Sequence, residues 1–148
     1  MKKIFYTAAL LFAASMFISC EDEKIIEESK LPALSKQFLK THFNGTATTH
    51  IIKDIDGFNR SYTVYLENGF EIDFSRKGDW DEVEGHLKAV PQSILDLLPA
   101  GILQYVNQTY PDMEITKVNK ESYGYDIGLN NDIEIEFNSS GKFIKFDD

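Results

Sequence analysis

The stretch NGFEIDFSRKGDW (residues 68–80) decides the fold, because the chain repeats its pattern as NDIEIEFNSSGKF (residues 131–143). Both copies have the form of a strand, a turn that contains glycine, and the start of a further strand. Strict alternation of apolar and acidic residues puts the two kinds of side chain on opposite faces of the strand. The apolar positions are Phe70, Ile72, Phe74, Ile133, Ile135 and Phe137, and the acidic positions are Glu71, Asp73, Glu134 and Glu136. Each copy is therefore expected to belong to an antiparallel sheet with one buried and one solvated face.

The match extends on both sides of this hairpin. The segment that opens with Leu31-Pro32-Ala33 has its counterpart at Leu98-Pro99-Ala100, at an offset of 67 residues, and the strands match at an offset of 63 residues. The turn glycines and the aromatic residues beside them correspond as well. This many matches in order predict an internal duplication, with a first unit at residues 31–86 and a second at residues 87–148.

Each unit is expected to be a helix followed by four antiparallel strands. Leu34, Phe38 and Leu39 follow at helical spacing, which predicts a helix over residues 31–43 that Asn44-Gly45 ends. Strands are expected at residues 47–55, 60–67, 69–76 and 79–84. The predicted fold class is α+β: a tandem duplication of a helix and a four-stranded antiparallel sheet, with the helices on one face of the sheets. A short extra helix (90–98) would join the units and be interrupted at Pro99.

The N-terminal residues have the form of an export signal. Two lysines precede a short apolar run and a small residue before Cys20. We predict a lipoprotein signal peptide at residues 1–19 and lipidation of Cys20; an ordinary cleaved signal and a membrane-anchor helix are the alternatives. Residues 20–30 are expected to form an acidic tether. Glu21-Asp22-Glu23 resembles the acidic export tag of surface lipoproteins of Bacteroidota and equally fits a solvated linker.

The charge of the chain limits its partners. The net charge is −9, and removal of residues 1–19 with Lys2 and Lys3 would leave −11. Such a surface disfavours nucleic acid and favours basic partners or cations. The one cysteine excludes an intrachain disulfide. We expect a protein of the cell envelope, held to the membrane by a lipid anchor only and either periplasmic or exposed at the outer-membrane surface.

Three segments carry a family resemblance. They are FSRKGDWDEVEG (74–85), VPQSILDLLPAGILQYVNQTYPDMEITKV (90–118) and YGYDIGLNNDIEIEFNSSGKFIKFD (123–147). They resemble the PepSY-like, β-lactamase-inhibitor-like family of periplasmic proteins of Bacteroidota, and the resemblance covers about residues 31–148. It implies tandem α-β4 units and an extracytoplasmic location. It implies no particular activity, since one fold can host many functions.

The residue types that usually carry catalysis do not form a constellation. His42, His50 and His86 lack the spacing of metal ligands, and the thiol of Cys20 is assigned to the lipid. His42 lies near a predicted helix end, where an interaction with the helix dipole is a sufficient role. We therefore predict no enzyme, no catalytic residue, no metal ligand and no cofactor.

Other candidate positions have simpler structural explanations. Asp54 and Asp56 supply too few acids for a calcium loop, and a hairpin turn explains them better. Trp80 follows a turn glycine and is expected in the core. Tyr65 should point away from the core by its strand position, and Tyr123 is a second candidate for an exposed contact.

The remaining candidate for function is the polar face of the sheets. The predicted binding face comprises Tyr65, Glu71, Asp73, Glu134 and Glu136, with the carboxylates solvated and ionised. Its expected partner is an envelope protein or peptide with a basic patch. The alternatives are a cation-binding module that takes calcium, a structural envelope protein without a discrete ligand, and a hydrolase that uses the paired carboxylates.

Overall fold

The computed structural model describes residues 23–56 and 59–147. The strands are β1 (Lys24–Ile25), β2 (Thr48–Asp56), β3 (Asn59–Leu66), β4 (Glu71–Phe74), β5 (Trp80–Glu84), β6 (Ile115–Glu121), β7 (Gly124–Leu129), β8 (Glu134–Asn138) and β9 (Phe143–Asp147). The helices are η1 (Glu28–Lys30), α1 (Ala33–His42), α2 (Gln92–Leu95) and α3 (Ala100–Thr109). A helix followed by four strands thus occurs twice along the chain, and the predicted strands are confirmed to within a few residues.

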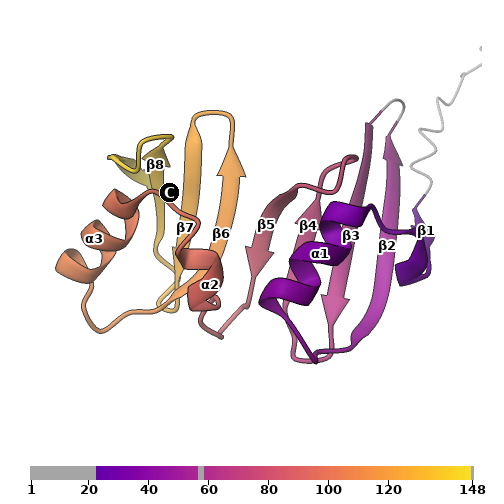
Figure 1. Cartoon of the computed structure of the whole chain (residues 1–148). Coiled ribbons are helices and arrows are strands. Elements are labelled where there is room, and N and C mark those ends of the chain that lie inside the picture. The colour runs from indigo at the N-terminus through magenta and orange to yellow at the C-terminus, as the bar shows by residue number, and fades with distance from the viewer. Residues whose placement is uncertain (1–22, 57–58, 148) are drawn as a thin grey trace, which may run out of the picture.

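The nine strands of the described residues belong to one antiparallel sheet in chain order, β1 to β9 (Figure 1). The expectation of two separate four-stranded sheets is therefore wrong. Strand β5 pairs with β6 through Glu82–Asn119, Val83–Val118 and Glu84–Lys117, which joins the two halves. The physical reason is that an edge strand has unpaired backbone groups, and β6 satisfies those of β5.

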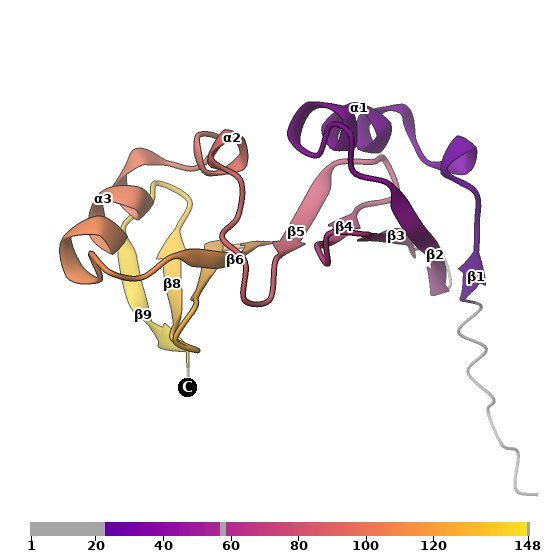
Figure 2. The same ribbon diagram turned by 90° about the horizontal axis from the view of Figure 1, so that it is seen from below.

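One apolar row runs through both halves on the inner face of the sheet. Its members are fully buried and each is the direct partner of the next: Val64, Ile72, Val83, Val118, Ile127 and Ile135. Helices α1, α2 and α3 lie on this side of the sheet, as Figure 2 shows. The prediction that the helices cover one face is confirmed.

Each long helix packs an aromatic residue onto the strands below it. Phe38 of α1 lies edge-on to Phe74 at 5.7 Å and stacks on Trp80 at 5.7 Å between ring centroids. Tyr105 of α3 lies edge-on to Phe137 at 5.4 Å and stacks on Phe143 at 5.1 Å. The expected core position of Trp80 is confirmed, since it is 9% exposed.

The start of each long helix contacts a glycine turn of its own half. Gly78 has φ +94°, and a Cβ there would lie 2.6 Å from Cβ of Pro32. Gly141 has φ +80°, and a Cβ there would lie 2.8 Å from Cβ of Pro99. The fully buried Ser35 donates its hydroxyl to the Gly78 carbonyl at 3.3 Å. Only glycine combines this backbone conformation with so close an approach.

Two details of the predicted helices differ. The helical spacing predicts Leu34 among the apolar residues of α1, but it is 49% exposed and Ser35 takes the buried position. Helix α2 ends at Leu95, and Pro99 caps α3, so the expected interruption lies between two separate helices.

The signal peptide and Cys20 lie outside the described residues, as does the Gly57 half of the predicted Asp56-Gly57 turn. Among the residues that are described, no helix is long and apolar enough to cross a membrane.

Candidate functional site

The face of the sheet opposite the helices carries two rows of polar residues. Strand register makes each member the direct partner of the next. The first row is Thr63, Asp73, Glu82, Asn119, Asp126, Glu136 and Lys145. The second row is Tyr65, Glu71, Glu84, Lys117, Gly128, Glu134 and Asp147. Each row contains four carboxylates and one lysine, and we call the two rows together the acidic face.

All five predicted binding residues lie on the acidic face, Tyr65, Glu71 and Asp73 in the first half and Glu134 and Glu136 in the second. The sequence interpretation missed Glu82, Glu84 and Asp126, which connect these two groups into one surface. A signal for them exists, since Glu82 and Glu84 flank Val83 and Asp126 precedes Ile127.

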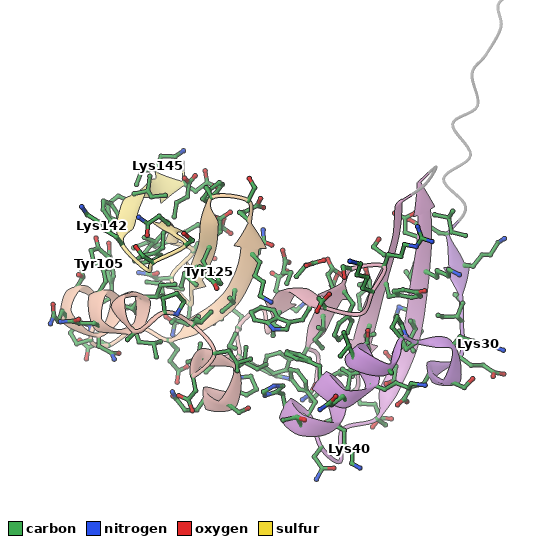
Figure 3. The ribbon with its side chains drawn as sticks, turned by 45° about the horizontal axis from the view of Figure 1, so that its top comes forward. Lys30, Lys40, Tyr105, Tyr125, Lys142 and Lys145 are labelled. Carbon is green, nitrogen blue, oxygen red and sulfur yellow. The ribbon has the colours of Figure 1, made fainter. Side chains whose placement is uncertain are left out.

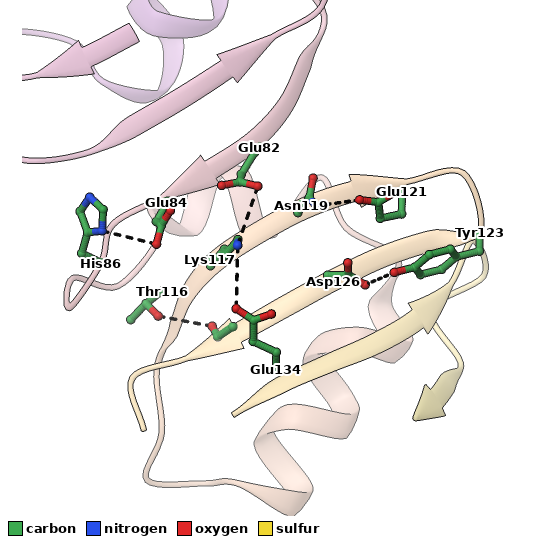
Figure 4. A network of polar contacts seen from close by, with 11 residues as sticks. Glu82, Glu84, His86, Thr116, Lys117, Asn119, Glu121, Tyr123, Asp126 and Glu134 are labelled. Atoms are coloured by element: carbon green, nitrogen blue, oxygen red, sulfur yellow. Dashed lines mark hydrogen bonds and ion pairs between the residues drawn. The ribbon is translucent and has the colours of Figure 1, made fainter. Parts of the chain in front are cut away.

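Lys117 lies at the junction of the two halves and forms an ion pair with a carboxylate of each half. Its Nζ is 3.9 Å from Glu82 Oε2 and 3.8 Å from Glu134 Oε1 (Figure 4). Desolvation disfavours its charged form, but Glu82, Glu134 and Glu84 outweigh that effect and raise the pKa of Lys117. A lysine from the chain itself thus shows that the face can hold a cation between carboxylates.

Desolvation also affects several carboxylates of the face. Burial raises the pKa of Glu82, with a further contribution from Asp73, while Lys117 opposes the shift. Burial likewise raises the pKa of Asp126, although the hydroxyl of Tyr123 donates to its Oδ1 at 2.5 Å. The side chain of Glu82 is 23% exposed, so these groups are partly removed from water without being enclosed.

Two of the predicted carboxylates are less exposed to water than the expectation of a solvated face implies. Glu136 is 12% exposed in its side chain and pairs with Lys145 at 3.0 Å. Oδ1 of Asp73 is buried and has no hydrogen-bond partner among the described residues. Neighbouring side chains on the pleated sheet shield both groups, because direct cross-strand partners are only about 5 Å apart.

Aromatic side chains border the face. Tyr65 points away from the core, as predicted, and stacks on His50 at 4.3 Å between ring centroids. Desolvation and the nearby Glu71, which accepts a hydrogen bond from Tyr65, raise the pKa of the Tyr65 hydroxyl. Tyr123 is 40% exposed, and its hydroxyl is held by Asp126. Tyr65 therefore adds a rigid amphipathic contact beside the carboxylates.

His42 makes a contact that the sequence did not predict. It lies at the end of α1, where a helix dipole would favour its charged form, but burial lowers its pKa. Its Nδ1 is 2.8 Å from the hydroxyl of Ser93 in α2, so it links the two halves on the helix side.

Among residues 23–56 and 59–147, no group of three or more His, Cys, Asp or Glu side chains could hold a metal ion. Three buried oxygens of the first half nevertheless lack a hydrogen-bond partner among the described residues: Oδ1 of Asp54, Oδ1 of Asp73 and the hydroxyl of Ser75. The direct partners of Asp54 and Asp73 on β3 are Ser61 and Thr63, two residues apart. Asp54 and Asp73 are therefore diagonal neighbours across one strand.

Residues 60–145 match the model of the family described as "Putative beta-lactamase-inhibitor-like, PepSY-like". The chain belongs to this PepSY-like family. No curated protein matches the chain.

Three solved structures from Bacteroides have the same fold. A "putative calcium-regulated periplasmic protein" of Bacteroides thetaiotaomicron is 32% identical, with a TM-score of 0.78 over 85% of this chain and 97% of that one. A periplasmic protein of unknown function from Bacteroides vulgatus is 29% identical, with a TM-score of 0.80 over 86% of this chain and 100% of that one. A second periplasmic protein of Bacteroides vulgatus is 32% identical, with a TM-score of 0.78 over 87% and 99%.

Proposed function

We propose that this protein is a non-enzymatic envelope lipoprotein whose acidic face binds a basic segment of another envelope protein or peptide. The description of its structural neighbours as periplasmic supports the location. The apolar start of the chain and its Cys20 support a lipid anchor. The repeated helix-turn contacts at Gly78 and Gly141 support an origin by tandem duplication.

The observation that carries the proposal is the position of Lys117 between Glu82 and Glu134. A lysine or arginine of a partner could make the same contact between two carboxylates elsewhere on the acidic face. Lys117 and Lys145 are the two cations of these rows, against eight carboxylates. An incoming basic segment would therefore meet a field of one sign, which favours fast, salt-sensitive association.

Charge reversal on the acidic face tests this function. The variant Glu71→Lys with Glu134→Lys places a lysine in each half of the second row. Cross-linking in the native envelope, followed by mass spectrometry, should recover a partner with the wild type and lose it with the variant. Binding to the partner so identified should weaken about tenfold or more at low salt, and less as salt rises, because screening removes the charge effect.

The matched control is Glu28→Lys with Asp112→Lys, which changes the net charge equally but at two exposed sites outside the strands. Partner recovery should be unchanged in this control. Equal loss in both double variants would indicate a general charge effect, and no loss in either would leave a structural protein without a ligand on this face.

A specific observation favours a second candidate function, calcium binding. The buried oxygens of Asp54, Asp73 and Ser75 lack partners among the described residues, and oxygen ligands are those that calcium prefers. One structural neighbour is named as calcium-regulated. Calorimetric titration with calcium should then give heat that Asp54→Asn with Asp73→Asn abolishes; absence of heat and of a thermal shift in the wild type removes this candidate.

A further inference from the structure

Strand β9 is the last strand of the sheet, and its outer edge is open among the described residues. The corresponding strand of the first half, β5, has no such open edge because it pairs with β6. Within residues 23–56 and 59–147, β9 pairs with β8 alone. Figure 2 shows it at the end of the sheet opposite β1, and Figure 3 shows Lys142 and Lys145 at this end, far from Lys30. An open edge has backbone groups ready to pair with another strand.

The corresponding edge in the first half is already used. At the offset of 63 residues, Glu82, Val83 and Glu84 of β5 correspond to Lys145, Phe146 and Asp147 of β9. These three residues of β5 are the ones that pair with β6. The pairing of β6 with β5 therefore shows that the strand at this position of a unit can accept another strand along its outer edge.

The helix side of this edge exposes a large aromatic side chain. Phe146 is 44% exposed, although it is the direct partner of the fully buried Ile135. With Tyr110 and Ile133 it lines a shallow groove of about 300 Å³. Exposed aromatic surface beside an unpaired edge is typical of an interaction site.

The charges on the other side of β9 make the edge self-complementary. Asp147 lies directly opposite Glu134, a like-charge pair that destabilises the sheet. Lys145 lies two residues away on the same face and pairs with Glu136. If two β9 strands meet antiparallel with Phe146 opposite Phe146, then each Lys145 lies opposite the Asp147 of the other copy.

We propose that the partner of this edge is a second copy of the chain, joined through β9 in that register. The twofold axis passes between the two Phe146 residues, as is usual for closed dimers. The two Lys145–Asp147 pairs also offset the repulsion between Asp147 and Glu134. The axis is perpendicular to the sheet, so both acidic faces point the same way and form one bivalent surface. The interface is small, so we expect a dissociation constant in the micromolar range or weaker.

Disulfide trapping tests the register in the full-length protein. In Phe146→Cys, the two thiols would lie on the axis, where partner Cα atoms are about 4.5–5.5 Å apart, within disulfide range. Mild oxidation should give a covalent dimer on a non-reducing gel. The wild type measures any dimer that forms through Cys20. Leu87→Cys measures non-specific cross-linking of an exposed cysteine away from β9, since Leu87 is 81% exposed. Dimer no stronger than in these controls would overturn the proposal, and so would a mixed disulfide with another protein.

A charge swap gives an independent readout that leaves Phe146 intact. Analytical ultracentrifugation should show that Lys145→Glu raises the dimer dissociation constant about tenfold. In this variant the new glutamate of each copy lies opposite Asp147 of the other, so the dimer contains two repulsive pairs. The double variant Lys145→Glu with Asp147→Lys restores the complementary pairs and should recover most of the affinity. If the double variant stays as weak as the single one while both remain folded by circular dichroism, the proposed register is wrong. Neither readout involves a binding partner of the acidic face, so this proposal and the proposed function can fail separately.

Discussion

At the scale of single residues, Glu82 is the side chain that the tertiary structure changes most clearly. It lies in mid-sheet, with Asp73 on one side and Asn119 on the other, and with Lys117 diagonal to it. Burial raises its pKa despite the lysine. Its ionised form is therefore less stable in the folded chain than in the unfolded chain.

We predict that Glu82→Gln stabilises the protein at pH 7, by about 2 °C in Tm. The folded pKa lies above the unfolded one, so ionisation costs stability above the folded pKa, and this cost disappears as the pH falls towards the unfolded value. The difference between variant and wild type in thermal melts should therefore shrink from pH 7 to about pH 4. The comparison variant is Glu134→Gln, which also contacts Lys117 but is 41% exposed and should give no such gain. A Glu82→Gln protein less stable than wild type at pH 7 would mean that the ion pair outweighs desolvation.

At the scale of elements, the contact between a helix start and a glycine turn organises each half. Gly78 meets Pro32 and Ser35 of the first helix, and Gly141 meets Pro99 and the Ile102 amide of the third. Positive φ and close approach coincide at both turns. The turn thus fixes where the helix lies over the strands that follow it.

We predict that Gly78→Ala and Gly141→Ala each lower the free energy of unfolding by about 3 kcal/mol, from backbone strain together with the displaced helix. The control is Gly45→Ala. Gly45 has φ +81°, but a Cβ added there would have no atom within 4 Å, so only the strain of about 1 kcal/mol is expected. Urea denaturation measures all three. Equal losses at the three glycines would show that helix contact contributes nothing.

At the scale of the whole molecule, the pairing of β5 with β6 turns two halves into one sheet. Val83 and Val118 are direct partners and both are fully buried, so the apolar row is continuous across the junction. On the helix side, His42 and Ser93 make a second link. Lys117 makes a third on the acidic face.

We predict that the halves unfold together. Trp80 is the one tryptophan and reports on the core of the first half and on its contact with Lys120 of β6, whereas circular dichroism reports on both halves. The two signals should give coincident urea transitions in the wild type and in Val118→Ala, which should lose about 2 kcal/mol. Leu97→Ala, at a 52% exposed site, should lose less than about 0.5 kcal/mol. Separate transitions for the two signals would show that the halves are independent.

Local pattern was enough to predict much of this molecule. The alternation in FEIDF and IEIEF determined which side chains of β4 and β8 face the core, because neighbouring residues of a strand point to opposite sides. The same rule placed Tyr65, Glu71, Asp73, Glu134 and Glu136 on the other face. The turn glycines and the helix that precedes each set of strands were also readable locally.

Only the tertiary structure decided which strands are neighbours across the two halves. The pairing of β5 with β6 brings Glu82, Lys117 and Glu134 together, although they are distant in the sequence. It also decides how far Asp73 and Glu136 are shielded from water, since shielding depends on side chains of adjacent strands. Strand periodicity is a property of one segment, whereas pairing and desolvation depend on contacts between segments. The sequence by itself therefore determined which side of each strand its acidic residues occupy. The folded sheet decided how far the acidic face extends, its charge balance and, among the described residues, the open edge at β9.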